Sequence, residues 1–222
     1  MMENLDTHLP THLFEINNLV IQARIPPGKG PFPVFTILHG WTGDENSMWI
    51  FASRLPVNAI VLSPRGLYES PMGGYSWYQK RDKAWPVLND FDSAIDSLTD
   101  VLTTDFFPKG DFSQFRMLGF SLGAALVYSF ALKQAKPLRA LAGLSGFVPD
   151  GAAGLEEARP LQDLAVFIAH GTQDQLVPIE RARQGVEVLQ QTGAIISYCE
   201  HEAGHKLNAD CFRSLQIFFQ TN

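Results

Sequence analysis

Short apolar runs alternate with amphipathic segments along most of this chain, and that alternation limits the folds open to it. Six runs fit buried strands, namely 34–38, 59–62, 115–119, 138–144, 165–169 and 194–199, and residues 14–25 fit an edge strand or a hairpin. Apolar residues recur at helical spacing over 90–104, 122–134, 179–191 and 210–219. Continuous apolar strands that alternate with helices predict an α/β fold, with a mostly parallel central sheet and helices on both faces.

Most of the predicted strands end in a small or polar residue. His39-Gly40, Ser145-Gly146 and His170-Gly171 each follow directly after an apolar run. The carboxyl ends of parallel strands lie at one edge of a sheet, and ligands bind beyond that edge. The sequence therefore predicts that the chemistry collects there.

Bulk properties exclude several classes of function. The length of 222 residues suits one domain, which we place over residues 1–222. The net charge of −6, with no run of Lys or Arg, argues against a nucleic-acid partner. No apolar run reaches membrane-spanning length, so no stable membrane insertion is expected.

Compartment is predicted from the cysteines and the first residues. Cys199 and Cys211 are too few for a disulfide framework, and we expect two free thiols in a reducing compartment. Residues 1–13 lack the apolar core of a secretory signal. Together these features predict a cytoplasmic protein.

The pentapeptide Gly119-Phe120-Ser121-Leu122-Gly123 has the G-x-S-x-G spacing of a nucleophile elbow. An apolar strand enters it and a helical segment leaves it, which is the context that such an elbow requires. Ser121 would then stand at a helix N-terminus, where developing negative charge is favoured. The alternative is that Ser121 only caps the helix.

A serine hydroxyl needs a base and an acid that orients the base. Asp174 follows the fifth predicted strand and His205 follows the sixth, in the chain order serine, acid, histidine. Asp174 would hold the imidazole of His205 in the tautomer that accepts the proton of Ser121. This order predicts a catalytic triad of Ser121, Asp174 and His205.

Other residues compete for these roles. His201 is an alternative base, while His170 fits a structural hydrogen-bonding role better than a catalytic one. Asp163 and Asp150 are alternative acids, although both precede the fifth strand. No His, Cys, Asp or Glu cluster has metal-ligand spacing, so no metal site is predicted.

Acyl transfer also needs donors for the oxyanion. The backbone N–H of Leu122 and that of Trp41, in the loop after strand 34–38, are the predicted donors. Apolar side chains near this edge are the predicted walls of the substrate pocket, namely Tyr75, Trp77, Phe147 and Val177. Walls of this kind favour a neutral acyl substrate over a charged one.

The chain resembles the phospholipase/carboxylesterase family of α/β-hydrolases, which includes acyl-protein thioesterases and lysophospholipases. The matching stretches are Leu38-His39-Gly40, Ser63-Pro64-Arg65-Gly66, Tyr75-Ser76-Trp77-Tyr78, the pentapeptide around Ser121, Leu144-Ser145-Gly146, His170-Gly171-Thr172-Gln173-Asp174 with Val177-Pro178, and Gly204-His205. The resemblance implies an α/β-hydrolase fold without a large cap domain, the triad named above, and no cofactor. Trp41-Thr42-Gly43 departs from the leucine and glycine that are frequent in the family, and a bulky Trp41 would favour smaller esters.

The leading hypothesis is therefore a serine carboxylesterase that cleaves small to medium acyl esters of small molecules through an acyl-Ser121 intermediate. A lysophospholipase or an acyl-protein thioesterase is the alternative. A peptidase on the same fold is a less favoured interpretation that the triad alone does not exclude. A non-catalytic binding module is disfavoured because all three triad residue types and both oxyanion positions are present. The sequence leaves open whether the chain forms a homodimer.

Overall fold

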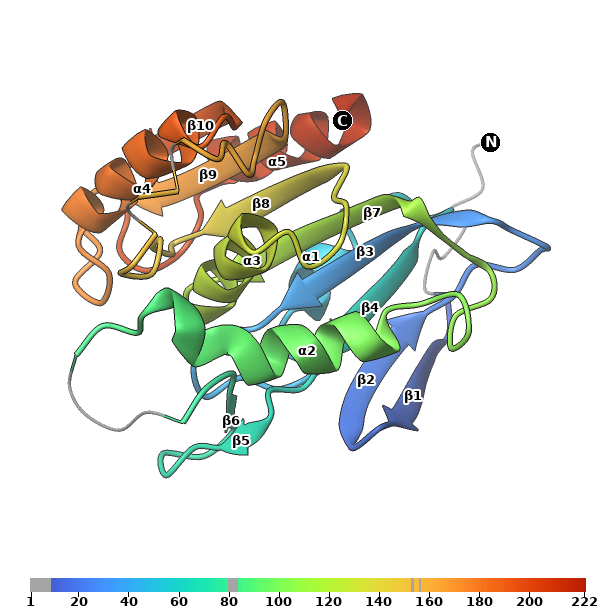
Figure 1. Ribbon diagram of the computed structural model, residues 1–222. Helices are drawn as coiled ribbons and strands as arrows, with labels where there is room; N and C mark the ends of the chain where they lie inside the picture. Colours follow the sequence, from blue (N-terminus) through green and yellow to red (C-terminus); the bar gives the residue numbers. More distant parts are fainter. Residues whose placement is uncertain (1–8, 80–83, 153, 156) are drawn as a thin grey trace.

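A central sheet of eight strands organises the computed structural model, which describes residues 9–79, 84–152, 154–155 and 157–222 (Figure 1). The strands of this sheet are β1 (Thr11–Ile16), β2 (Leu19–Arg24), β3 (Phe32–Leu38), β4 (Ile60–Pro64), β7 (Gly110–Phe120), β8 (Ala140–Leu144), β9 (Ala165–Gly171) and β10 (Ile195–His201). Their spatial order is β1-β2-β4-β3-β7-β8-β9-β10. All neighbours from β4 to β10 are parallel, while β1 and β2 are antiparallel, so the predicted mostly parallel sheet is confirmed.

The first two strands form the hairpin that the sequence left as one of two options. Asn17 and Asn18 link them with φ values of 50° and 65°. Asparagine tolerates positive φ better than most residues, and two such residues in succession match the turn geometry of tight hairpins. The hairpin adds to the outer edge of the sheet through pairing of β2 with β4.

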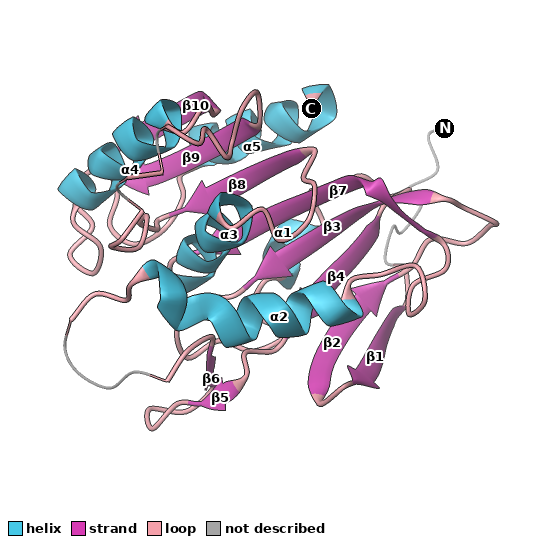
Figure 2. Cartoon of the chain, in the orientation of Figure 1, coloured by secondary structure: helices cyan, strands magenta, loops and turns pink. Residues whose placement is uncertain are grey.

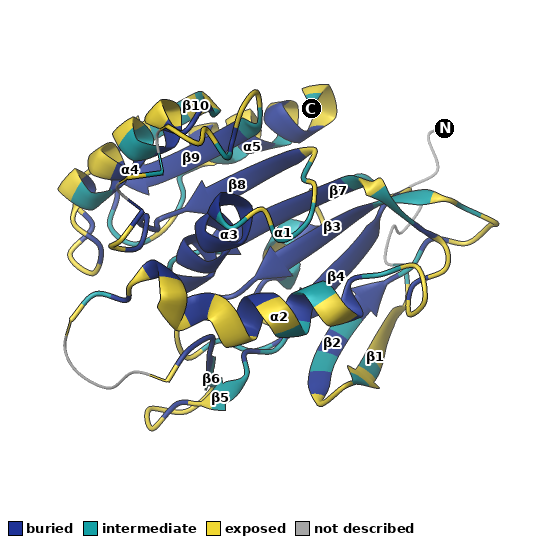
Figure 3. Cartoon of the chain, viewed as in Figure 1, coloured by how far each residue is buried: buried dark blue, intermediate teal, exposed yellow. Residues whose placement is uncertain are grey.

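Helices cover both faces of the sheet (Figure 2). They are α1 (Trp49–Ala52), the 3₁₀ turn η1 (Leu88–Phe91), α2 (Asp92–Val101), α3 (Leu122–Leu132), α4 (Ile179–Gln191) and α5 (Ala209–Thr221). Side chains of α2, α3 and α4 pack into one apolar cluster and those of α1 and α5 into the other. All residues of α3 are buried, which explains why its sequence is apolar on nearly every face (Figure 3).

The sequence did not predict the shortest helix and the two shortest strands. Helix α1 has four residues, and β5 (Tyr68–Glu69) pairs with β6 (Tyr75–Ser76) over two residues each. Strand β7 begins five residues before the predicted strand, because its polar start at Asp111, Ser113 and Gln114 hides the extension towards Gly110. Its pairing with β3 shifts register between Pro33 and Val34.

The prediction of two free thiols is wrong. Cys199 on β10 and Cys211 in the first turn of α5 form a disulfide with a Cα–Cα distance of 5.8 Å. The loop after β10 turns back so that α5 packs against the same strand, which brings together two cysteines that are 12 positions apart. The covalent ring encloses the loop that carries His205.

Candidate active site

Strand β7 runs into a sharp turn at Ser121, and α3 begins at the next residue. Ser121 has φ 55° and ψ −115°, a backbone conformation that residues other than glycine seldom adopt. Backbone strain of this kind costs about 1–3 kcal/mol and is typical of active sites. Ser121 is only half-buried although its neighbours in α3 are buried, so it remains accessible at the carboxyl end of β7.

The two glycines of the pentapeptide allow the close packing around this turn. A Cβ atom on Gly119 would collide with the carbonyl of Gly123, and one on Gly123 would collide with the carbonyl of Leu38. Strand β7, helix α3 and strand β3 therefore approach as closely as bare backbone permits. The glycine spacing is a packing requirement of the turn at Ser121.

Asp174 and His205 meet at the same edge of the sheet. His205 Nδ1 lies 2.7 Å from Asp174 Oδ2, and the carboxylate is fully buried while the imidazole is 17% exposed. The backbone N–H groups of Leu176 and Val177 donate to Asp174 Oδ1 at 2.9 and 3.0 Å. The ring of Phe120, next to Ser121, stands edge-on to the His205 ring with centroids 5.0 Å apart. The three residues predicted as a triad thus follow β7, β9 and β10 at the carboxyl edge of the sheet.

His39 organises the loop after β3. The ring is fully buried; its Nδ1–H donates to the Gly40 carbonyl at 2.7 Å and its Nε2 accepts from the Gly66 N–H at 2.9 Å. The indole N–H of Trp77 donates to the His39 carbonyl at 2.7 Å, and the two rings lie with centroids 4.7 Å apart and planes tilted by 31°. Burial lowers the pKa of His39, so the ring is neutral.

This loop lies against the nucleophile. A Cβ atom on Gly40 would stand 3.2 Å from the Cβ of Ser121, so Trp41, the next residue, begins beside the reacting centre. Leu122 is the first residue of α3, where backbone N–H groups have no acceptor within the helix. Both predicted oxyanion donors therefore belong to segments that flank Ser121, and their roles stay predictions.

The four predicted pocket residues lie in different surroundings. Trp77 is fully buried beneath the His39 loop, and Phe147 is 5% exposed and packs edge-on against Trp85. Val177 is 3% exposed and holds Asp174 through its N–H. Tyr75 alone is half-buried. Trp77 and Val177 thus support residues of the site, and the structure shows neither as an open wall.

Residue pairs that the sequence could not reveal surround the site. Arg65, at the end of β4, forms a bidentate pair with Glu45 at 2.7 and 2.8 Å and stacks over the Tyr75 ring at 4.7 Å. The guanidinium of Arg65 lowers the pKa of the Glu45 carboxyl. The sequence pointed only to Arg65, in the stretch Ser63-Pro64-Arg65-Gly66 that ends its strand. It gave no sign of the ion pair, because Glu45 lies 20 positions away from Arg65.

The competing residues have other partners. His201 Nε2 lies 2.8 Å from the Lys206 carbonyl, and His170 Nε2 lies 2.8 Å from the Val177 carbonyl, both in buried or half-buried settings. Asp150 pairs with Arg181 at 2.6 Å, and Asp163 is exposed. Of these residues, only His170 comes near the triad, at 3.4 Å from Asp174 Oδ2.

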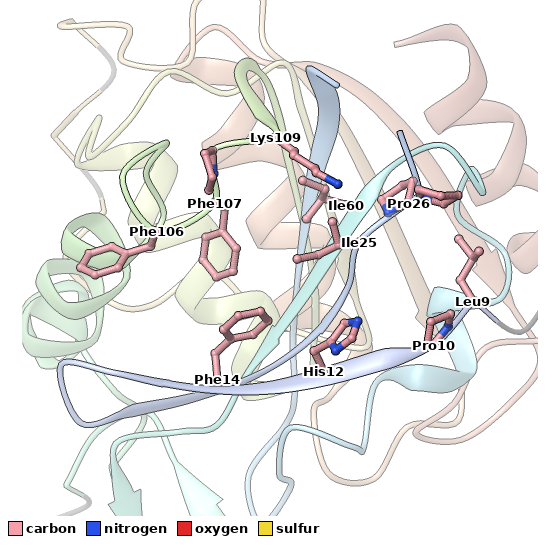
Figure 4. A pocket seen from close by; sticks show the side chains of 12 residues that line it. Leu9, Pro10, His12, Phe14, Ile25, Pro26, Ile60, Phe106, Phe107 and Lys109 are labelled. Carbon is pink, nitrogen blue, oxygen red and sulfur yellow. The ribbon is translucent and has the colours of Figure 1, made fainter. Parts of the chain in front are cut away.

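A largely apolar cavity of about 500 Å³ lies at the opposite end of the sheet (Figure 4). Ile60, the first residue of β4, and Lys109, just before β7, contribute to its lining together with Phe14 and Phe107. Ile60 and Lys109 lie at the amino ends of β4 and β7, whereas Ser121 lies at the carboxyl end of β7. The strained turn and the Asp174–His205 contact, rather than cavity size, identify the candidate site.

No group of three or more His, Cys, Asp or Glu side chains in the described part of the chain could hold a metal ion. No helix among those described is both long and apolar enough to cross a bilayer.

Comparison with known proteins gives concordant matches. The family described as Phospholipase/Carboxylesterase matches residues 21–222. A probable feruloyl esterase C from Aspergillus niger is 30% identical, over 82% of this chain and 64% of the fungal protein, so the chain spans less than two thirds of that relative. Structures of carboxylesterases from Bacillus cereus (TM-score 0.78, 20% identity, 90% and 93% of the two chains) and Mesorhizobium loti (TM-score 0.77, 18% identity, 96% and 99%) share the fold.

The family match covers nearly the whole described chain, and the structures superpose over nine tenths of it or more. The predicted α/β-hydrolase fold is therefore confirmed. The chain therefore belongs to the phospholipase/carboxylesterase family.

Proposed function

We propose that this protein is a serine carboxylesterase that cleaves small to medium acyl esters through an acyl-Ser121 intermediate. The observation that carries the proposal is the 2.7 Å contact between His205 Nδ1 and buried Asp174 Oδ2, at the sheet edge where Ser121 occupies a strained turn. Because Nδ1 donates to the carboxylate, Nε2 of the neutral imidazole is left as the base.

The chemistry follows from these positions. Ser121 Oγ attacks the acyl carbon, its proton passes to His205 Nε2, and the oxyanion accepts hydrogen bonds from the N–H groups of Leu122 and Trp41. His205 then returns the proton to the leaving alcohol as the acyl-serine forms. A water molecule, deprotonated by His205, attacks that ester and releases the carboxylic acid. No step needs a cofactor.

The preference for small to medium esters is proposed from the position of Trp41 next to the candidate site. Trp41 is 42% exposed and follows Gly40, where an added Cβ atom would stand 3.2 Å from the Cβ of Ser121. A large ring beside the nucleophile would shorten the space for an acyl chain and would offer a flat apolar surface. The name of the Aspergillus niger relative suggests including an aromatic ester, methyl ferulate, among the substrates. Lysophospholipid or thioester cleavage is the alternative.

The decisive experiment measures hydrolysis of p-nitrophenyl esters of graded chain length, and of methyl ferulate, by the wild type and by Ser121→Ala. We expect activity to be highest at short chains and to be lost in the variant. A fluorophosphonate probe should label the wild type once per chain and leave Ser121→Ala unlabelled.

Three outcomes would change the proposal. No hydrolysis of any ester would refute the esterase assignment, and activity retained in Ser121→Ala would refute the nucleophile. A maximum at long chains, or a preference for thioesters of equal length, would favour the lysophospholipase or thioesterase alternative.

Cytoplasmic location stays a prediction. Free thiols no longer support this prediction, because Cys199 and Cys211 form a disulfide and disulfides persist mainly in oxidising compartments. Alkylation of thiols in protein taken directly from its source, with and without prior reduction, would show which state occurs there. A homodimer likewise remains to be tested, by light scattering.

A further inference from the structure

His170 is a buried imidazole that the proposed chemistry does not use. It is the penultimate residue of β9 and is fully buried, and it pairs in register with Glu200 of β10. Burying an ionisable ring is unfavourable unless its polar atoms find partners. The two ring nitrogens of His170 differ sharply in this respect.

The contacts of His170 fix where its proton lies. Nε2 stands 2.8 Å from the Val177 carbonyl oxygen and 3.4 Å from Asp174 Oδ2. Both oxygens are acceptors, so Nε2 must carry the hydrogen. Nδ1 is buried without a hydrogen-bond partner among the described residues. A protonated ring would leave a buried N–H unpaired at Nδ1, and this favours the neutral ring with a single donor at Nε2.

Val177 links this donor to the triad. Its carbonyl accepts from His170, while its N–H donates to Asp174 Oδ1 at 3.0 Å. The other carboxylate oxygen, Oδ2, faces both His170 Nε2 and His205 Nδ1. The end of β9, the turn that follows it and the imidazole of His205 are therefore connected through one buried carboxylate.

We infer that His170 is a positioning residue, whose Nε2–H holds the turn at Val177 and the adjacent carboxylate so that Asp174 Oδ2 points at His205. The inference rests on the proposed function, because it assigns a task only if Asp174 and His205 act on Ser121. His170 touches neither substrate nor the reacting atoms in this scheme.

The charged groups around His170 are consistent with a neutral ring. Asp174 and Glu200 favour its cation, whereas His205 and His201 disfavour it. Glu200 is largely compensated by its bidentate pair with Arg183. Burial is the largest influence and lowers the pKa of His170. Burial and the unpaired Nδ1 therefore both favour the uncharged ring, with Nε2–H as its single donor.

The test compares His170→Gln with His170→Met. The two replacements have the same chain length, but only glutamine offers an N–H near the former Nε2 position. We expect His170→Met to lower kcat about 10–100-fold, as small misplacements of catalytic groups do, while His170→Gln recovers most of that loss. KM should change little in either variant, because binding contacts are untouched.

The pH profile provides a readout that loss of folding would not move. A misdirected carboxylate stabilises the protonated base less well, so the acid limb of kcat/KM should move to lower pH in His170→Met. It should stay near the wild-type position in His170→Gln. Rates are normalised to the fraction of chains labelled by the fluorophosphonate probe. Equal losses in both variants with an unmoved limb would overturn the inference.

Two further variants separate the possible failures. Thr192→Val removes a hydrogen bond from a fully buried hydroxyl to the Leu189 carbonyl, at the far end of α4, and should reduce stability without altering kcat. If Ser121→Ala retains activity, the proposed function itself fails. If Ser121→Ala is inactive while His170→Met matches the wild type, only the role of His170 fails.

Discussion

Asp174 uses both of its carboxylate oxygens, one for the backbone of its own turn and one for His205. In Asp174→Asn the amide can still accept from that backbone, but its NH₂ group then faces His205 Nδ1. The imidazole would turn to the tautomer whose Nε2 carries the proton and cannot act as a base. We expect kcat for p-nitrophenyl acetate to fall about 10⁴-fold, as in other Ser-His-Asp triads, with KM nearly unchanged.

Asp163→Asn is the matched control for that substitution. Asp163 is exposed and has a positive φ of 62°, which asparagine also tolerates, so its kcat should equal that of the wild type. A loss of less than tenfold in Asp174→Asn, or a loss as large in Asp163→Asn, would contradict the assignment of the acid.

Individual residues differ in how far the sequence predicts them. Ser121, Asp174 and His205 could be proposed because each follows a strand in a characteristic order, and the structure brings the strand ends together. The support given by Trp77 to His39 could not, because these residues are 38 positions apart. An apolar ring in a sequence does not reveal whether it faces a cleft or fills the space beneath a loop.

At the scale of elements, the disulfide joins the last strand to the last helix. Cys211 is fully buried and the bridge closes a loop with a sequence separation of 12, for which loop-closure entropy suggests about 3 kcal/mol. We expect full reduction to lower the free energy of unfolding by about that amount. Esterase activity should also become more sensitive to heat, because the enclosed loop carries His205. Urea unfolding with and without dithiothreitol measures the effect.

The double variant Cys199→Ala/Cys211→Ala is the control for reduction. It should unfold at lower urea than the oxidised wild type and show no further response to dithiothreitol. Two titratable thiols in the unreduced wild-type protein would restore the free-thiol interpretation. Fully reduced protein with unchanged stability would show instead that the bridge contributes little.

The sequence predicted the strands that are almost completely buried and missed strands that are only partly buried. Strands β3, β8 and β9 are buried almost throughout, so their apolar runs stand out in the sequence. The hairpin β5–β6 has no such run and depends on pairing with the His39 loop, where Tyr75 bridges Gly43. Its position is set by tertiary contacts that no local pattern contains.

At the scale of the whole molecule, burial of neutral histidines makes stability depend on pH. Burial lowers the pKa of both His39 and His170, whereas each takes up a proton near pH 6.5 in the unfolded chain. The stability these neutral rings confer is therefore fully present above pH 6.5 and is lost as the pH falls below it. Each histidine should contribute a slope of about 1.4 kcal/mol per pH unit in that range.

Urea unfolding at pH 7.5, 6.5 and 5.5 would measure this dependence, since that window lies about one pH unit or more above the pKa of a free glutamate, about 4.3, and so largely excludes carboxylates such as Glu45. The slope in His39→Gln should be smaller than in the wild type by the contribution of one histidine, because glutamine does not titrate. Comparing slopes rather than absolute stabilities removes the cost of the substitution itself, which shifts every point alike. An unchanged slope in both His39→Gln and His170→Gln would assign the proton uptake to other groups and would show that neither ring is held neutral by the fold.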